Sequence, residues 1–365
     1  MRTIHRLTTL VAFCGFFQLS LANEKPRELK IYNWSSYIDQ PLLNEFTAQT
    51  GIRVLTDAFD SNEALLAKTL TGNSGYDIIV PSDYVVTHLM EADQLLKLDF
   101  NKIPNYQNLW PFALESLATF EGINDYAVPY FWGTTGIGFD ALKIKALAPD
   151  APLDSYALVF DPKYASQIAS CGIYLLDSAV EMAPLVNMYL GQNPESTDTQ
   201  DLENVQKVLE GIRPYVKKFH SSEYISAIAN GDACVAIGWS GDFFIAKNSA
   251  DETGRNHDIQ YSVPKEGSIL WFDEMAILKD AKNVDEAYEF INFMLDAKNS
   301  AKASNTTMAP TPNLAAFEFL DPILRDNPIL FPPEESLKSV HIKRPYGIGA
   351  QKKLVRMWMK IKSGR

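Results

Sequence analysis

Residues 234–242 read Cys-Val-Ala-Ile-Gly-Trp-Ser-Gly-Asp, and this stretch decides the fold that we expect. Its first four residues are small or apolar and predict a short strand buried on both faces. The glycine ends that run, Trp239 stands at the exit of the strand, and Ser240 can open a helix with Asp242 in its first turn. An aromatic ring and a carboxylate therefore meet at the carboxyl end of a strand, where open α/β sheets bind ligands. Taken alone, the stretch also fits a core tryptophan beside a helix-capping aspartate.

The pairing of an aromatic residue with a strand end or an acid occurs at two other places in the chain. Trp34 lies close to Tyr37, just after an apolar stretch, and Trp271 precedes Asp273 by two residues. Ring faces next to carboxylates suit an organic cation, because a ring attracts positive charge over its face and a carboxylate neutralises it. The recurrence favours a binding site for such a cation.

The first third of the chain alternates strands and helices. Strands are predicted at 29–32, 52–55 and 76–80, with helices between them at 41–50 and 62–70. This β-α-β-α-β rhythm is typical of an α/β protein with a parallel sheet and helices on both faces. Residues 82–84 leave the third strand at its carboxyl end, as Trp34 leaves the first.

The amino terminus has the pattern of an export signal. Two arginines precede a mostly apolar run from Leu7 to Leu19, and Ser20-Leu21-Ala22 has the small residues of a cleavage site. The apolar run is too short to span a bilayer. We therefore expect residues 1–22 to be removed and the protein to be exported.

Cleavage would leave 343 of the 365 residues, which suits two lobes better than one domain. The chain has 33 basic and 45 acidic residues, and two of the basic ones lie in the signal, so the mature charge is −14. An acidic surface repels nucleic acid and attracts cations. We expect no nucleic-acid partner.

Two cysteines remain after cleavage, Cys171 and Cys234. An even pair in an exported chain favours a disulfide, and two separate buried thiols are the alternative.

Known catalytic and cofactor motifs are missing from the sequence. The five histidines are isolated, so no paired metal ligands are evident. Residues 238–242 lack the second glycine of a nucleophile elbow, and Gly136-x-Gly138 lacks the third glycine of a dinucleotide fingerprint. We expect no metal, no cofactor and no enzymatic activity, and therefore a binding protein.

Eight segments, taken in order, resemble the periplasmic polyamine-binding proteins of bacterial ABC transporters. They are residues 31–37, 59–63, 75–82, 129–138, 170–172, 231–242, 264–267 and 311–316. The resemblance implies an α/β, two-lobed periplasmic binding protein (type II-like) with a ligand cleft between the lobes. It implies a first lobe of residues 27–133 and 259–308, and a second of 134–258 and 309–365. We also expect a monomer in the periplasm.

The resemblance also implies the ligand-binding residues, which fall into three kinds. The aromatic positions are Trp34, Tyr37, Tyr84, Trp239 and Trp271; the polar contacts are Ser35 and Ser82; the ammonium partners are Glu181, Asp242 and Asp273. Three acids, with Tyr84 and Trp271 similar to the spermidine-preferring branch, predict a spermidine-like triamine as ligand, and putrescine is the other candidate.

Two positions depart from the family pattern. Ser36 stands where relatives carry an acid, and Ala309 stands where they carry a tyrosine. Losing one carboxylate and one ring leaves open which polyamine is preferred.

Two functions are compatible with this sequence. The first is delivery of the polyamine to an inner-membrane ABC permease. The second is a polyamine sensor, for norspermidine or spermidine, that presents its ligand state to a membrane signalling receptor. Permease and ATPase genes beside this gene would favour uptake, and a cyclic-nucleotide signalling gene would favour sensing.

Overall fold

The computed structural model describes residues 27–364 except 36, 38, 256, 332–336 and 338. The predicted export signal and Ser36 lie outside the described residues. Within these ranges no helix is long and apolar enough to cross a membrane.

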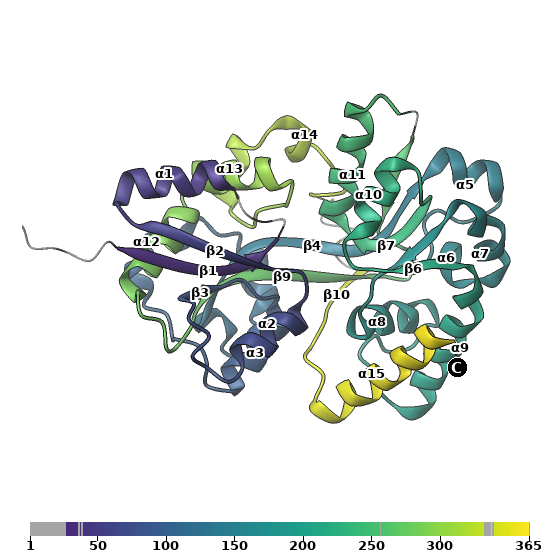
Figure 1. Cartoon of the computed structure of the whole chain (residues 1–365), viewed down its shortest axis with the longest axis horizontal. Coiled ribbons are helices and arrows are strands. Elements are labelled where there is room, and N and C mark those ends of the chain that lie inside the picture. The colour runs from purple at the N-terminus through teal and green to yellow at the C-terminus, as the bar shows by residue number, and fades with distance from the viewer. Residues whose placement is uncertain are drawn as a thin grey trace, which may run out of the picture.

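The described strands form one mixed sheet that runs through the whole molecule, in the order β2-β1-β3-β9-β4-β7-β5-β6. In addition, β8 pairs with β4 and β10 pairs with β9. The strands are β1 (Glu28–Trp34), β2 (Arg53–Phe59), β3 (Ile78–Ile79), β4 (Ala127–Asp140), β5 (Ile173–Leu175), β6 (Val216–Phe219), β7 (Val235–Trp239), β8 (Ile259–Ser262), β9 (Ser268–Ile277) and β10 (Val340–Ile342). Figure 1 shows the long strands β4 and β9 crossing from one half of the molecule to the other.

These two halves are the lobes of the fold. The first lobe has β1, β2 and β3 with α1 (Gln40–Thr50), α2 (Asn62–Thr69), α3 (Asp83–Glu91), α4 (Pro111–Leu117), α12 (Val284–Met294) and α13 (Ala297–Thr307). The second has β5, β6 and β7 with α5 (Ala141–Leu147), α6 (Ala157–Phe160), α7 (Pro162–Ile168), α8 (Ala179–Tyr189), α9 (Thr199–Ile212), α10 (Glu223–Asn230), α11 (Ser240–Glu252) and α15 (Ile348–Ser363). Helix α14 (Pro322–Arg325) packs near α11 through the contact of Leu324 with Phe244. The α/β two-lobed fold is confirmed.

Short 3-10 turns complete the connections. They are η1 (Phe100–Lys102), η2 (Pro104–Asn108), η3 (Ile123–Asp125), η4 (Ala169–Cys171), η5 (Arg213–Tyr215) and η6 (Leu314–Phe319).

Residues 234–242, from which we predicted the fold, form the predicted strand and the start of the predicted helix. Strand β7 ends at Trp239, and α11 begins at Ser240 with Asp242 in its first turn. The strand lies inside the sheet, with β4 on one side and β5 on the other, and its residues 235–238 are buried. Helix α1 likewise begins where expected, since the Asp39 side chain accepts a hydrogen bond from the Leu42 N–H, and it ends at Gly51, which has a φ of 73°.

The parallel pairing predicted for the first three strands is correct, and the strands at the centre of the sheet pair differently. β1 pairs in parallel with β2 and β3, and β5 pairs in parallel with β6 and β7. In contrast, β9 is antiparallel to both β3 and β4, and β4 is antiparallel to β7. An alternation of strands and helices reports only on neighbours in sequence, so it could not reveal this pairing of distant segments.

Two of the expected lobe boundaries differ from the observed packing. Strand β8, assigned to the first lobe, pairs with residues 137–140 of β4 in the second. The turn η6, assigned to the second lobe, packs against α13, and the Trp110 N–H nearby donates to the Pro312 carbonyl at 2.7 Å. Both segments lie next to a crossover between lobes, and the lobe against which each one packs depends on contacts with distant residues.

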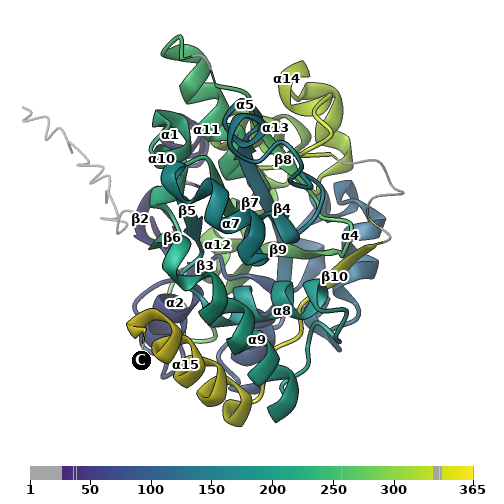
Figure 2. The same ribbon diagram turned by 90° about the vertical axis from the view of Figure 1, so that its right-hand side faces the viewer.

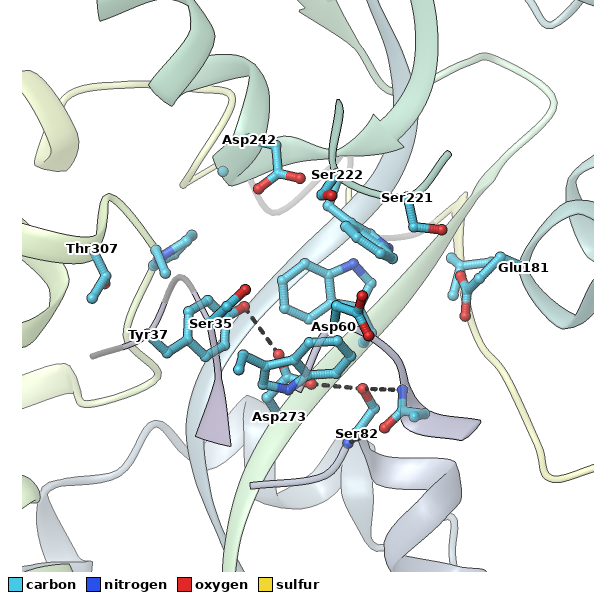
Figure 3. A pocket seen from close by; sticks show the side chains of 18 of the residues that line it. Ser35, Tyr37, Asp60, Ser82, Glu181, Ser221, Ser222, Asp242, Asp273 and Thr307 are labelled. Atoms are coloured by element: carbon cyan, nitrogen blue, oxygen red, sulfur yellow. Dashed lines mark hydrogen bonds between the residues drawn. The ribbon is translucent and has the colours of Figure 1, made fainter. Parts of the chain in front are cut away.

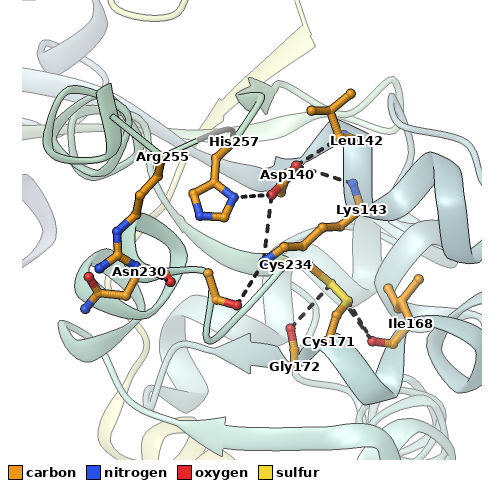
Figure 4. A network of polar contacts seen from close by, with 11 residues as sticks. Asp140, Leu142, Lys143, Ile168, Cys171, Gly172, Asn230, Cys234, Arg255 and His257 are labelled. Carbon is orange, nitrogen blue, oxygen red and sulfur yellow. Dashed lines mark hydrogen bonds and ion pairs between the residues drawn. A yellow bond between two sulfur atoms is a disulfide. The ribbon is translucent and has the colours of Figure 1, made fainter. Parts of the chain in front are cut away.

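Cys171 and Cys234 form a disulfide in the structure, with their Cα atoms 5.5 Å apart (Figure 4). It joins η4 to the residue directly before β7. Beside it, the buried Asp140 carboxylate accepts hydrogen bonds from the Leu142 N–H and pairs with His257 Nδ1 at 2.9 Å. These contacts fix the second-lobe end of β4, and with it the strand that carries Trp239.

Candidate functional site

One pocket lies between the two lobes, where β4 and β9 cross, and all ten predicted ligand-binding residues line it. They are Trp34, Ser35, Tyr37, Ser82, Tyr84, Glu181, Trp239, Asp242, Trp271 and Asp273. The space amounts to about 1020 Å³ when counted out to its open mouth. Figure 3 shows Asp242 and Asp273 on opposite sides of the ring-lined space and Glu181 at one end.

The ends of strands bring these residues together. Trp34 is the last residue of β1 and Trp239 the last of β7, while Ser82 directly precedes α3 after β3. Trp271 and Asp273 lie in β9 where it passes between the lobes. The sheet thus places both lobes' strand ends around the same space, as expected for ligand sites in α/β folds.

Close packing of a ring on the backbone shapes one wall. Gly133 of β4 faces the Trp271 indole so closely that a Cβ atom there would lie 2.4 Å from the ring carbon Cζ2. A larger residue at position 133 would therefore push the indole away from β4. On the opposite side the rings of Trp34 and Trp239 meet edge to face, with centroids 6.5 Å apart. These faces form apolar walls that are rich in π-electron density.

Asp273 is a buried carboxylate held by two hydroxyl groups. The Tyr37 hydroxyl donates to its Oδ2 at 3.0 Å, and the Ser82 hydroxyl donates to its Oδ1 at 2.6 Å. Asn62 supports Ser82 from behind, donating to its Oγ at 3.0 Å (Figure 3). Burial raises the pKa of Asp273 to about 7, although these two hydroxyl hydrogen bonds act in the opposite direction.

Asp242 is the corresponding acid on the second lobe, and it is half-buried. The Tyr224 hydroxyl donates to its Oδ2, and the Trp239 N–H in turn donates to Tyr224 Oη at 3.1 Å. Burial raises the pKa of Asp242 to about 7. Each of the two acids would gain a large stabilisation of its ionised form from a cation placed beside it.

Three further charged residues, which we did not identify from the sequence, also line the pocket. Asp60 is exposed, whereas Asp83 is buried and accepts hydrogen bonds from the N–H groups of Tyr84 and Phe272. Lys343, which follows β10, donates to Glu181. Asp60 belongs to the segment 59–63 quoted for the resemblance and could have been found there, but no sequence pattern marks Lys343.

Of the two positions that depart from the family pattern, the structure describes one, Ala309. Ala309 lines the pocket together with Thr307 and Pro310, so the missing ring would have pointed into this space. Ser36 lies outside the described residues.

A two-lobed α/β fold with a pocket of ring faces and carboxylates between its lobes defines a receptor for a small solute. The sequence matches the family model of bacterial extracellular solute-binding proteins over residues 42–332. The chain belongs to this family, and it is a solute-binding protein and not an enzyme.

Three relatives illustrate the similarity. The putrescine-binding periplasmic protein SpuD of Pseudomonas aeruginosa is 41% identical over 365 residues, covering 100% of this chain and 98% of the relative. The putrescine-binding periplasmic protein PotF of Escherichia coli is 38% identical over 348 residues, covering 95% and 94%. The solved structure of the spermidine/putrescine ABC transporter substrate-binding protein PotD from Streptococcus pneumoniae matches with a TM-score of 0.76 and 32% identity, covering 93% of this chain and 99% of that one.

Proposed function

We propose that the protein captures a linear aliphatic polyamine in the periplasm and delivers it to an ABC transporter of the inner membrane. The observation that carries this proposal is the pair of carboxylates of Asp242, which is half-buried, and Asp273, which is buried, because they face one ring-lined pocket from different lobes.

The chemistry of the pocket matches a chain of methylene groups with an ammonium at each end. The rings of Trp34, Trp239 and Trp271 offer apolar faces for the methylenes. Contacts of an ammonium with such faces contribute about 0.5–2 kcal/mol each. A carboxylate shielded from water is strongly stabilised as an ion when a cation pairs with it, so Asp242 and Asp273 select for positive charge at two separate points.

The relatives support both parts of this proposal. Two of them are named as putrescine-binding periplasmic proteins, and the third is named as a substrate-binding protein of a spermidine/putrescine ABC transporter. Delivery to a transporter rather than to a signalling receptor is part of the proposal and rests on the transporter named in the third relative.

Titration calorimetry of the mature protein tests the binding function. We expect at least one of putrescine, spermidine, norspermidine and spermine to bind with a Kd of about 1 μM or lower, which corresponds to about −8 kcal/mol or tighter. Glutamate and glutamine serve as controls and should give no binding heat, because neither presents two ammonium groups. Absence of binding by all four polyamines would contradict the proposal.

A further inference from the structure

A lysine of the chain itself lies in the pocket. Lys343 follows directly after β10, in the segment that leads to α15 on the second lobe (Figure 2). Its side chain is only 5% exposed, its Nζ donates to Glu181 Oε1, and the same Nζ lies 4.0 Å from the centroid of the Tyr84 ring. An ammonium is therefore already held between a carboxylate and a ring face.

An ammonium between a carboxylate and a ring face is also the arrangement that we propose for each end of the ligand. The Lys343 Nζ is a primary ammonium, chemically equivalent to the end of a polyamine. It satisfies the charge of Glu181, so the carboxylate that was expected to bind a ligand ammonium has a partner within the chain. Moving either charge away without its partner is costly, because it leaves the other one buried and unpaired.

The remaining acids of the pocket can be sorted by what they already contact. Asp83 accepts two backbone N–H groups, Glu181 is paired with Lys343, and Asp60 is exposed to solvent. Asp273, which is buried, and Asp242, which is half-buried, are the two pocket acids whose carboxylates are held by hydroxyl groups, with no ion pair and no backbone N–H on them in the described structure. The pocket thus has two places for ligand ammonium groups, and the third is filled.

We propose that Lys343 is a specificity-determining residue that permanently occupies the cation position between Glu181 and Tyr84, so that the pocket prefers diamines over triamines. This inference rests on the proposed function and names its substrate class. A diamine needs only the two carboxylates of Asp242 and Asp273 and leaves the Lys343–Glu181 pair in place. A triamine would bring its third ammonium against the Lys343 ammonium, where like charges repel and no free carboxylate remains. The inference reverses the sequence-based expectation that three acids bind a triamine.

Calorimetry with putrescine and spermidine on three proteins tests the inference. The unmodified protein should bind putrescine at least tenfold more tightly than spermidine. Lys343→Ala removes the internal ammonium and frees Glu181, so the ratio of spermidine affinity to putrescine affinity should rise at least tenfold. In the double variant Lys343→Ala/Glu181→Gln the gain for spermidine should disappear, because the freed carboxylate is gone.

A matched control and a thermal melt accompany these variants. Lys302→Ala removes a half-exposed lysine that pairs with Glu45 outside the pocket, and it should leave the putrescine-to-spermidine ratio unchanged. If Lys343→Ala does not fold, the ratio of putrescine to spermidine affinity in the unmodified protein still tests the inference. Spermidine binding as tight as putrescine binding would overturn it. An unchanged ratio in a folded Lys343→Ala variant would overturn it as well. Binding of polyamines without the expected preference defeats only this inference, whereas absence of any polyamine binding defeats the proposed function.

Discussion

Replacing Asp273 or Asp242 with asparagine is expected to weaken polyamine binding by more than a hundredfold. Asp273 is buried and Asp242 is half-buried in the unliganded protein, and a ligand that fills the pocket would cover both, so in the complex each would pair with an ammonium that is shielded from water. Removing one member of a buried charged pair typically costs about 3–5 kcal/mol, and each 1.4 kcal/mol is a factor of ten in affinity. Titration calorimetry of the two variants with the preferred polyamine measures the loss.

Asp60→Asn is the matched control for these substitutions. Asp60 lines the same pocket but is exposed, so its loss should cost about 1 kcal/mol or less, a factor of roughly five. If Asp242→Asn and Asp273→Asn also bind within fivefold of the parent, Asp242 serves only the first turn of α11, Asp273 serves only to anchor Tyr37 and Ser82, and the proposed site is wrong.

The same two variants should fold at least as stably as the parent when no ligand is present. Burial raises the pKa of each carboxyl above its unfolded value, so the stability linked to the protonated acid is present at low pH and lost as the pH rises through about 7. Asparagine carries no charge to bury. At pH 8 the unliganded variants should therefore melt at the parent temperature or above it, which separates a loss of binding from a loss of folding.

Polyamine affinity is expected to fall steeply as the pH is lowered through 7. The ligand amines resemble lysine, with a pKa near 10.4, and stay protonated over this range. Asp242 and Asp273, with pKa values of about 7, must release their protons to pair with them. Well below pH 7 the affinity should therefore drop by about tenfold per pH unit for each carboxyl that has to ionise.

Calorimetry at pH 8, 7, 6 and 5, at constant ionic strength, checks this dependence. The double variant Asp242→Asn/Asp273→Asn provides the control, because its remaining weak binding should change little over the same range. A flat profile for the parent protein would show that neither carboxyl takes up a proton in the unliganded pocket.

The sequence was sufficient to predict the strand ends that build the site. The stretch around Trp239 and Asp242 has a buried strand, a glycine and a helix start in immediate succession, and local preferences alone determine such a succession. Trp34 and Ser82 could be placed for the same reason. Trp34 ends β1 and Ser82 follows β3. These two strands are parallel, so their carboxyl ends lie at the same edge of the sheet and bring the two residues together.

What the sequence did not reveal depends on contacts between distant segments. The antiparallel pairing of β9 with β3 and β4 joins residues that are far apart in the chain. Lys343 reaches Glu181 across 162 positions, and the local sequence around it does not show which distant group its side chain meets. A lysine there is most simply interpreted as a solvated surface charge, and only the three-dimensional structure shows that it is buried in the pocket.

A crystal structure of the protein with bound putrescine tests the central claim most directly. We expect one ligand ammonium at hydrogen-bond distance, about 2.7–2.9 Å, from the Asp242 carboxylate and the other at the same distance from the Asp273 carboxylate. The methylene chain should lie against the Trp34, Trp239 and Trp271 rings, with Lys343 still paired to Glu181. A ligand bound elsewhere, or one whose ammonium groups contact neither aspartate, would contradict it.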